Sequence, residues 1–242
     1  MSQSTIFPLQ NDHGSITKAI INVQGNTIAF YSGHLDYLNC ALYLPRSYDG
    51  STWKVLEKPI TNISKIQEIN MASKRDEAIA AFINDAKSEV LNGNVVIYGG
   101  DNNEPSHLDW VEANKDLYDH HGVVMPWFNT VQLDKAGFLD AYRTVFSNPI
   151  THPGFTYPAN NTAVPVTKLA WSPNADDRDR IDFIFYYPDT RLKLENVAIL
   201  GPRGDIVRNK RVIENTADNI ITPKNIWPSD HKAVLAVFKL NI

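Results

Sequence analysis

The chain has 242 residues, 43% of them hydrophobic and 21% charged, which is an ordinary composition for a globular protein. None of its apolar stretches is long enough to cross a bilayer, which excludes a membrane-spanning helix. Its formal net charge of −4 disfavours a protein that binds nucleic acid mainly through the phosphate backbone, because such proteins usually present a basic surface.

Strands and a long helix are predicted early in the chain. Residues 16–23 and 27–32 are rich in β-branched and aromatic side chains and flank Gln24-Gly25-Asn26, a pattern typical of a β-hairpin. Residues 45–72 contain scattered proline and glycine, which predicts a long loop. Residues 73–91 carry apolar side chains at helical spacing and end before Asn-Gly, which predicts a helix.

Further elements follow along the chain. Residues 95–98 are continuously apolar, as in a buried strand, and Ser106 begins a capping-box pattern that predicts a short helix. Residues 181–187 and 233–240 have the composition of two more strands. The elements do not alternate in the regular rhythm of a doubly wound sheet, so we expect an α/β (α+β) sandwich with mixed sheets. No repeat or long linker divides the sequence, so we expect residues 1–242 to form one domain.

Four short polar segments follow or interrupt the predicted strands. They are residues 32–36 (Ser-Gly-His-Leu-Asp), 98–105 (Tyr-Gly-Gly-Asp-Asn-Asn-Glu-Pro), 180–185 (Arg-Ile-Asp-Phe-Ile-Phe) and 227–234 (Trp-Pro-Ser-Asp-His-Lys-Ala-Val). Loops at strand ends commonly hold catalytic groups. Each segment alone is most simply a turn or a structural ion pair, but the combination in this order is much more specific.

Asp182 stands among the apolar residues of a predicted strand. A carboxylate buried there without a partner would cost on the order of several kcal/mol, so it requires a charged or hydrogen-bonding neighbour. Histidine is the usual partner when a carboxylate orients a general base. Two or more carboxylates with a histidine also suit Mg²⁺ or Mn²⁺ phosphate chemistry, in which oxygen ligands hold the metal and the imidazole handles a proton.

In this order the motifs resemble those of the endonuclease/exonuclease/phosphatase (DNase I-like) superfamily, and they span residues 32–238. Residues 103–110 are similar to a bacterial branch of uncertain substrate. The superfamily includes DNase I-like nucleases, abasic-site endonucleases, neutral sphingomyelinases and inositol-polyphosphate phosphatases. The resemblance implies a four-layer αββα sandwich with two mixed β-sheets and an active site at one end of the sheets.

The resemblance also implies roles for the matching acids and base. His231 would be the general base that activates water for in-line attack on phosphorus, and Asp182 would fix the orientation of its ring. Asp101 would position the nucleophile or help to bind the metal, which would be Mg²⁺ or Mn²⁺. Asp230 would lie at the metal or in its hydration shell.

Other positions would contact the substrate. The resemblance implies that Asn103 donates to a phosphate oxygen and that His34 contacts the phosphate or assists the leaving group. Trp171 and the aromatic segment 153–157 are candidates for an apolar wall around the leaving group. The charged run 176–180 is most simply a solvated loop before a strand, although the resemblance places this loop at the border of the site, where it could contact the substrate.

The sequence departs from the superfamily pattern in two ways. Asn102 stands where an aromatic residue is usual, which we expect to alter packing more than chemistry. Two N-terminal signatures, an Asn and a metal-binding Glu, have no counterpart before His34, so we interpret the chain as the C-terminal portion of the full fold. Glu104 and Asp36 are the candidates to replace the Glu.

The leading hypothesis is a metal-dependent phosphoesterase that hydrolyses a phosphodiester or a phosphomonoester. The alternative is a catalytically impaired or non-catalytic binding protein on the same scaffold, or a chain completed by a separate N-terminal segment. A small phosphate ester, a lipid headgroup and a nucleic acid all stay open as substrates. The N-terminus carries no targeting signal, which makes a cytoplasmic location the default, and an extracytoplasmic one would require an upstream signal peptide.

Overall fold

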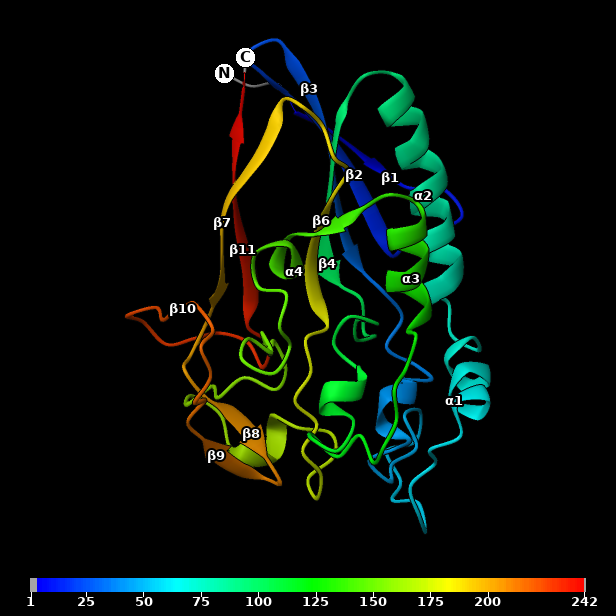
Figure 1. Cartoon of the computed structure of the whole chain (residues 1–242), viewed down its shortest axis with the longest axis vertical. Coiled ribbons are helices and arrows are strands. Elements are labelled where there is room, and N and C mark those ends of the chain that lie inside the picture. The colour runs from blue at the N-terminus through cyan, green and yellow to red at the C-terminus, as the bar shows by residue number, and fades with distance from the viewer. Residues whose placement is uncertain (1–3, 242) are drawn as a thin grey trace.

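The structure is a computed structural model that describes residues 4–241, and its central feature is a six-stranded sheet in the order β1-β2-β3-β4-β6-β5 (Figure 1). Its strands are β1 (Ser4–Pro8), β2 (Ile16–Val23), β3 (Asn26–His34), β4 (Val95–Asp101), β5 (Leu139–Asp140) and β6 (Asp182–Tyr186). β3 and β4 are parallel, and every other pair is antiparallel.

A second, three-stranded sheet lies across from the first on one side (Figure 1). It consists of β10 (Ile220–Ile221), β7 (Leu192–Leu200) and β11 (Ala233–Leu240), with β10 parallel and β11 antiparallel to β7. Val197 and Ile199 of β7 pack with Val95 and Ile97 of β4 in an apolar cluster between the sheets. Both sheets are therefore mixed, and the predicted α+β class is confirmed.

Helices cover the opposite face of the larger sheet. α2 (Arg75–Leu91) and α3 (Phe128–Lys135) lie there (Figure 1), and Phe82 of α2 contacts the rings of Tyr31 and Tyr98. On the outer face of the smaller sheet Leu235 and Val237 of β11 are exposed. Residues 4–241 thus show three of the four layers that the superfamily resemblance implies. Among these residues, no helix has the length and apolar content needed to cross a membrane.

Loops and short elements gather at the lower end of the sandwich in Figure 1. They include α1 (Ile63–Asn70), the 3-10 turns η1 (Ala41–Tyr43), η2 (Glu112–Asn114) and η3 (Val166–Lys168), and the hairpin of β8 (Asp205–Val207) and β9 (Lys210–Val212). A separate apolar cluster around Trp110 and Trp127, both fully buried, holds part of this region together. The helix α4 (Ala141–Val145) packs beside β6 and β7. The loops at this end are therefore anchored by buried side chains, which can hold functional groups in fixed positions.

Most predicted elements occur, with some corrections. The hairpin, the strands at β4, β6 and β11 and the helix α2 lie where the sequence predicts them. The prediction of a loop over 45–72 is wrong in part, because α1 begins at Ile63 with Asn62 accepting from the Lys65 backbone. The helix predicted at Ser106 is a turn instead, in which the Ser106 hydroxyl accepts from the backbone of Leu108.

Candidate functional site

Strand register places three polar residues side by side at one end of the larger sheet. His34 pairs with Asp101 in the parallel β3–β4 ladder, and Asp101 pairs with Asp182 in the antiparallel β4–β6 ladder. Residues that pair directly across strands project to the same face of the sheet. His34 Nε2 lies 3.6 Å from Asp101 Oδ2. Sequence segments far apart along the chain are therefore aligned by backbone pairing alone.

Two glycines make this alignment sterically feasible. Gly33 and Gly100 precede His34 and Asp101 and are themselves paired across β3 and β4. A Cβ atom on Gly100 would lie only 2.0 Å from the Gly33 carbonyl oxygen, so no larger residue fits without displacing a strand. The Gly-Gly that the sequence suggests as a simple turn is thus part of the strand end that carries Asp101.

His231 lies in the turn that precedes β11 and approaches Asp101 and Asp182 from the side of the second sheet. Its Nδ1 lies 2.9 Å from Asp182 Oδ2, and its ring packs at 4.9 Å from the Tyr157 ring. Its backbone carbonyl accepts a hydrogen bond from Trp227 Nε1 at 2.6 Å. Ligand atoms of Asp101, Asp182 and His231 all lie within 4.8 Å of one another. These three residues therefore form a compact group that could hold a metal ion.

Burial and neighbouring charge shift the pKa values of two members of this group. Burial raises the pKa of the Asp101 carboxyl to about 7, and the nearby Asp182 carboxylate acts in the same direction. Burial opposes the charge on the His231 ring, but the hydrogen bond and charge of Asp182, with the charge of Asp101, outweigh it and raise the pKa of His231 to about 9. The group as a whole thus favours positive charge at its centre.

The other candidate residues lie around this group. Asn103 has a backbone φ of +48°, and its Nδ2 donates to the Leu35 carbonyl, which leaves its second amide hydrogen for a ligand. Asp230 follows Ser229 in the turn, and its backbone carbonyl accepts from Ala159. Asp230 is not one of the three grouped residues, and its predicted contact with a metal stays a prediction.

Three other residues noted in the sequence have defined hydrogen-bond partners. Asn102 is fully buried and accepts a hydrogen bond from the Tyr98 hydroxyl, so it serves packing. Glu104 is buried and accepts from Asn70 Nδ2 and the Asn129 backbone, which commits both its oxygens to the protein. Asp36 accepts from backbone amides, including that of Lys74. Neither acid is in the three-residue group, so neither replaces the expected Glu there.

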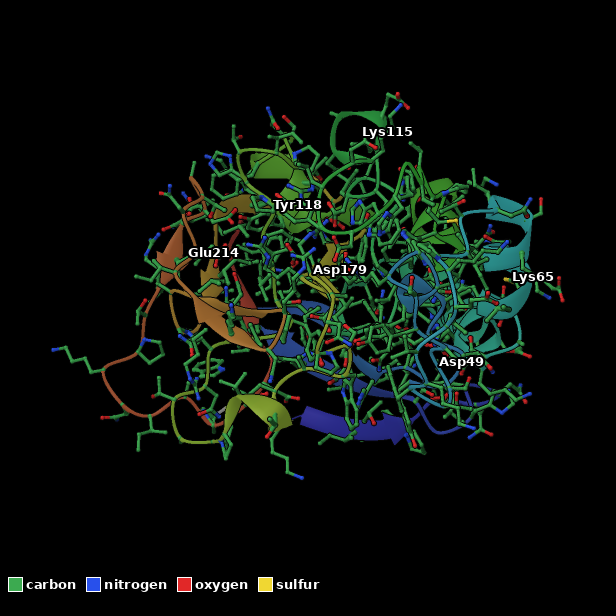
Figure 2. The ribbon with its side chains drawn as sticks, turned by 90° about the horizontal axis from the view of Figure 1, so that it is seen from below. Asp49, Lys65, Lys115, Tyr118, Asp179 and Glu214 are labelled. Atoms are coloured by element: carbon green, nitrogen blue, oxygen red, sulfur yellow. The ribbon has the colours of Figure 1, made fainter. Side chains whose placement is uncertain are left out.

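A cavity of about 370 Å³ opens beside this group. His34, Asp101, Asn103 and His231 line it, together with Trp171 as the sequence suggests. Tyr157 of the aromatic segment 153–157 also lines it, as do Asp177 and Asp179 of the charged run, whereas Tyr43 and Trp53 were not recognised from sequence. Figure 2 looks onto this end of the molecule and places Asp179 near its middle.

The segment 176–180 is not the solvated loop that its charges suggest. Asp177, Asp179 and Arg180 are almost fully buried. Asp179 is paired with the buried guanidinium of Arg46 and accepts from Trp110 Nε1. Arg180 is paired with Asp140 at 2.7 Å. Long-range cations therefore bring this acidic run into the interior, where Asp177 meets the cavity.

No family model matches the chain. It is 26% identical over 228 residues to "Uncharacterized protein F14F9.5" of Caenorhabditis elegans, in a match that covers 92% of this chain and 63% of that protein. The chain therefore spans less than two thirds of that relative. Among solved structures, it is similar to D. rerio TDP2 complexed with single-strand DNA product, with a TM-score of 0.46, 16% identity, and 98% and 67% of the two chains covered.

Another similar structure is an endonuclease/exonuclease/phosphatase family protein from Leptotrichia buccalis, with a TM-score of 0.38 and 17% identity. The match covers 93% of this chain and 54% of that chain.

Proposed function

We propose that this chain is a hydrolase of phosphate ester bonds that works with a divalent metal ion, Mg²⁺ or Mn²⁺. The observation that carries the proposal is the hydrogen bond between His231 Nδ1 and Asp182, formed next to Asp101 at the edge of a cavity. A carboxylate that binds one ring nitrogen of a histidine fixes the tautomer and the direction of the other nitrogen. This is the arrangement that a general base requires.

The residues fit a divalent metal ion. Asp101 and Asp182 bring two carboxylates together, and burial with the neighbouring Asp182 charge raises the pKa of Asp101, an effect that a bound cation would offset. Carboxylate oxygens are the ligands that Mg²⁺ prefers, and Mn²⁺ also accepts an imidazole. Asp101 would hold the ion, with Asp230 as the second predicted ligand, and the ion would supply charge stabilisation for the phosphoryl oxygens.

The protein side chains would carry out the other parts of the reaction. A cation bound beside His231 would lower its raised pKa and favour the neutral ring, which, with Nδ1 protonated and bonded to Asp182, offers Nε2 as an acceptor for a proton from water. Asn103 supplies an amide donor at the cavity edge, and His34 is exposed beside Asp101, where it can contact the phosphate or the leaving oxygen. Water attacks phosphorus in line with the leaving oxygen and gives a proton to His231 as the P–O bond to the leaving group breaks. The alkoxide takes up a proton from solvent, and His231 returns its proton to solvent.

The test is hydrolysis of two model esters, bis(p-nitrophenyl) phosphate and p-nitrophenyl phosphate, with Mg²⁺, with Mn²⁺ and with EDTA. We expect turnover of at least one ester that requires the metal, and a loss of about 100-fold or more in Asp101→Asn. Asp116→Asn removes the same charge at an exposed position and should leave the rate unchanged. Absence of turnover with either metal would favour the alternative, a non-catalytic binding protein on this scaffold.

A further inference from the structure

The cavity beside the proposed catalytic group has an aromatic lining. Trp53 and Trp171 stack on each other with ring centroids 5.1 Å apart and an interplanar angle of 25°, and Tyr43 meets Trp53 edge-on at 5.0 Å. Trp171 is 56% exposed although it is a large apolar side chain at a cavity. Exposed indole surface next to a hollow is suited to packing against a planar ring.

A buried carboxylate with an unused oxygen lines the same cavity. Asp177 is 1% exposed, and its Oδ2 accepts from the Ser172 hydroxyl at 2.6 Å. Its Oδ1 is buried and has no hydrogen-bond partner among the described residues. An orphaned buried acceptor costs about 1–3 kcal/mol, so a donor that binds in the cavity and reaches this oxygen would be favoured. Burial also raises the pKa of this carboxyl to about 7.

The charge of the lining disfavours a second anionic group next to Asp177. Asp177 and Asp179 contribute carboxylates, and the described residues that line the cavity include no lysine or arginine. The buried guanidinium of Arg46 is paired with Asp179. A phosphate or carboxylate placed against Asp177 would therefore meet a like charge, whereas a hydrogen-bond donor would meet an acceptor.

We propose that the cavity binds the alcohol side of the ester through a planar aromatic ring that carries an N–H or O–H donor other than the esterified oxygen. The ring packs against the indoles of Trp53 and Trp171, and the donor reaches Asp177 Oδ1. The identity of this ring as the leaving group rests on the proposed phosphoesterase function. Binding of the ring itself does not, because neither the indoles nor Asp177 belong to the group formed by Asp101, Asp182 and His231.

The experiment uses free ring compounds without phosphate, so it needs neither metal nor turnover. N-acetyltyrosinamide (O–H donor), its O-methyl ether (no donor), adenosine (N–H donor) and tetramethylammonium are titrated into the whole chain. The indole N–H resonances are followed by NMR and assigned by single substitution. We expect at least one donor ring to shift the signals of Trp53 and Trp171, while those of the buried Trp110 and Trp127 stay in place. The ether should bind about 10-fold more weakly than its parent.

Asp177→Asn is the most specific test of the proposed hydrogen bond to Oδ1. The Ser172 hydroxyl would keep the amide oxygen at the position of Oδ2, so the amide nitrogen would stand where Oδ1 now accepts. Affinity for the donor ring should fall about 10-fold and the preference for it over the ether should vanish, with unchanged unfolding temperature. Trp171→Leu should weaken both rings, and Asp116→Asn, an exposed charge change, should weaken neither.

Three results would overturn the proposal. They are equal binding of the tyrosinamide and its ether together with no binding of adenosine, binding of tetramethylammonium alone, and wild-type affinity in Asp177→Asn. Ring binding without ester hydrolysis would contradict the proposed function and leave the ring site standing. Ester hydrolysis without ring binding would contradict the ring site and leave the proposed function standing.

Discussion

Asp101 and Asp182 face each other directly across the β4–β6 ladder, and both carboxylates lie within 4.8 Å of a ring nitrogen of His231. Two like charges on neighbouring strands repel each other, and this cost is highest where water is excluded. Such a pair persists in a fold when it serves a bound cation or a proton. Several measurable consequences depend on this relationship.

The charge of Asp101 should destabilise the metal-free protein. Its pKa is raised to about 7 in the folded state, so the folded state binds its proton more tightly than the unfolded state does. Stability from this group is therefore lost as pH rises from the unfolded value of 3.8 through about 7. We expect Asp101→Asn to raise the free energy of unfolding at pH 8 by on the order of 1–3 kcal/mol, and to change it little at pH 3.5. Urea unfolding in EDTA measures both values.

The His231 ring should remain protonated well above neutral pH when no metal is present. Its raised pKa means that the imidazolium–Asp182 pair contributes stability that is full below 6.5 and is lost as pH rises through about 9. In Asp182→Asn the pKa should fall by at least one unit, because the largest stabilising partner has lost its charge. NMR titration of the ring protons, with Asp116→Asn as a charge-matched control, measures the shift. A pKa unchanged in Asp182→Asn would show that the hydrogen bond is absent.

Adjacent glycines in β4 should differ sharply in their tolerance to substitution. A Cβ on Gly100 would collide with the Gly33 backbone at 2.0 Å, whereas a Cβ on Gly99 would meet nothing closer than 3.6 Å. Gly100→Ala should cost on the order of 2–4 kcal/mol and displace His34 from Asp101, and Gly99→Ala should cost little. Thermal unfolding and the NMR signal of His34 report the two effects. Similar losses in both variants would contradict the strand register.

A buried ion pair should fix the turn that carries His231. The next residue, Lys232, is fully buried and pairs with Asp205 at 2.7 Å and with Glu214. Lys232→Ala leaves two buried carboxylates without a cation and should cost on the order of 3–5 kcal/mol. Lys65→Ala, at an exposed ion pair with Glu68, should change the melting temperature little. A small effect of Lys232→Ala would show that the network is solvated.

Sequence predicts the part of the site that depends on strand ends. Asp101, Asp182 and His231 stand next to apolar runs whose strand character is local, and the strand register then brings them together. Of the cavity lining, Trp171 and the segment 153–157 could be suggested from sequence, but the rest could not. Trp53 comes from a segment without periodicity, and its stacking on Trp171 depends on tertiary packing.

Asp177 shows that a charged sequence segment need not be exposed to solvent. A run of alternating acids and arginines normally lies in solvent. Here Arg46, distant in sequence, supplies a buried partner for Asp179 and draws the segment inward. The strand β7 was not predicted from the sequence for a related reason. Its burial depends on the facing sheet, and its buried and exposed residues do not alternate strictly.

The central claim is that His231, oriented by Asp182, acts as the base in metal-dependent ester hydrolysis. The most direct measurement is kcat/KM with Mn²⁺ for the wild type, His231→Gln and Asp182→Asn, on whichever model ester the wild type hydrolyses. We predict losses of about 100-fold or more in both variants, with folding and Mn²⁺ affinity largely retained in His231→Gln. Wild-type activity in His231→Gln would contradict the account.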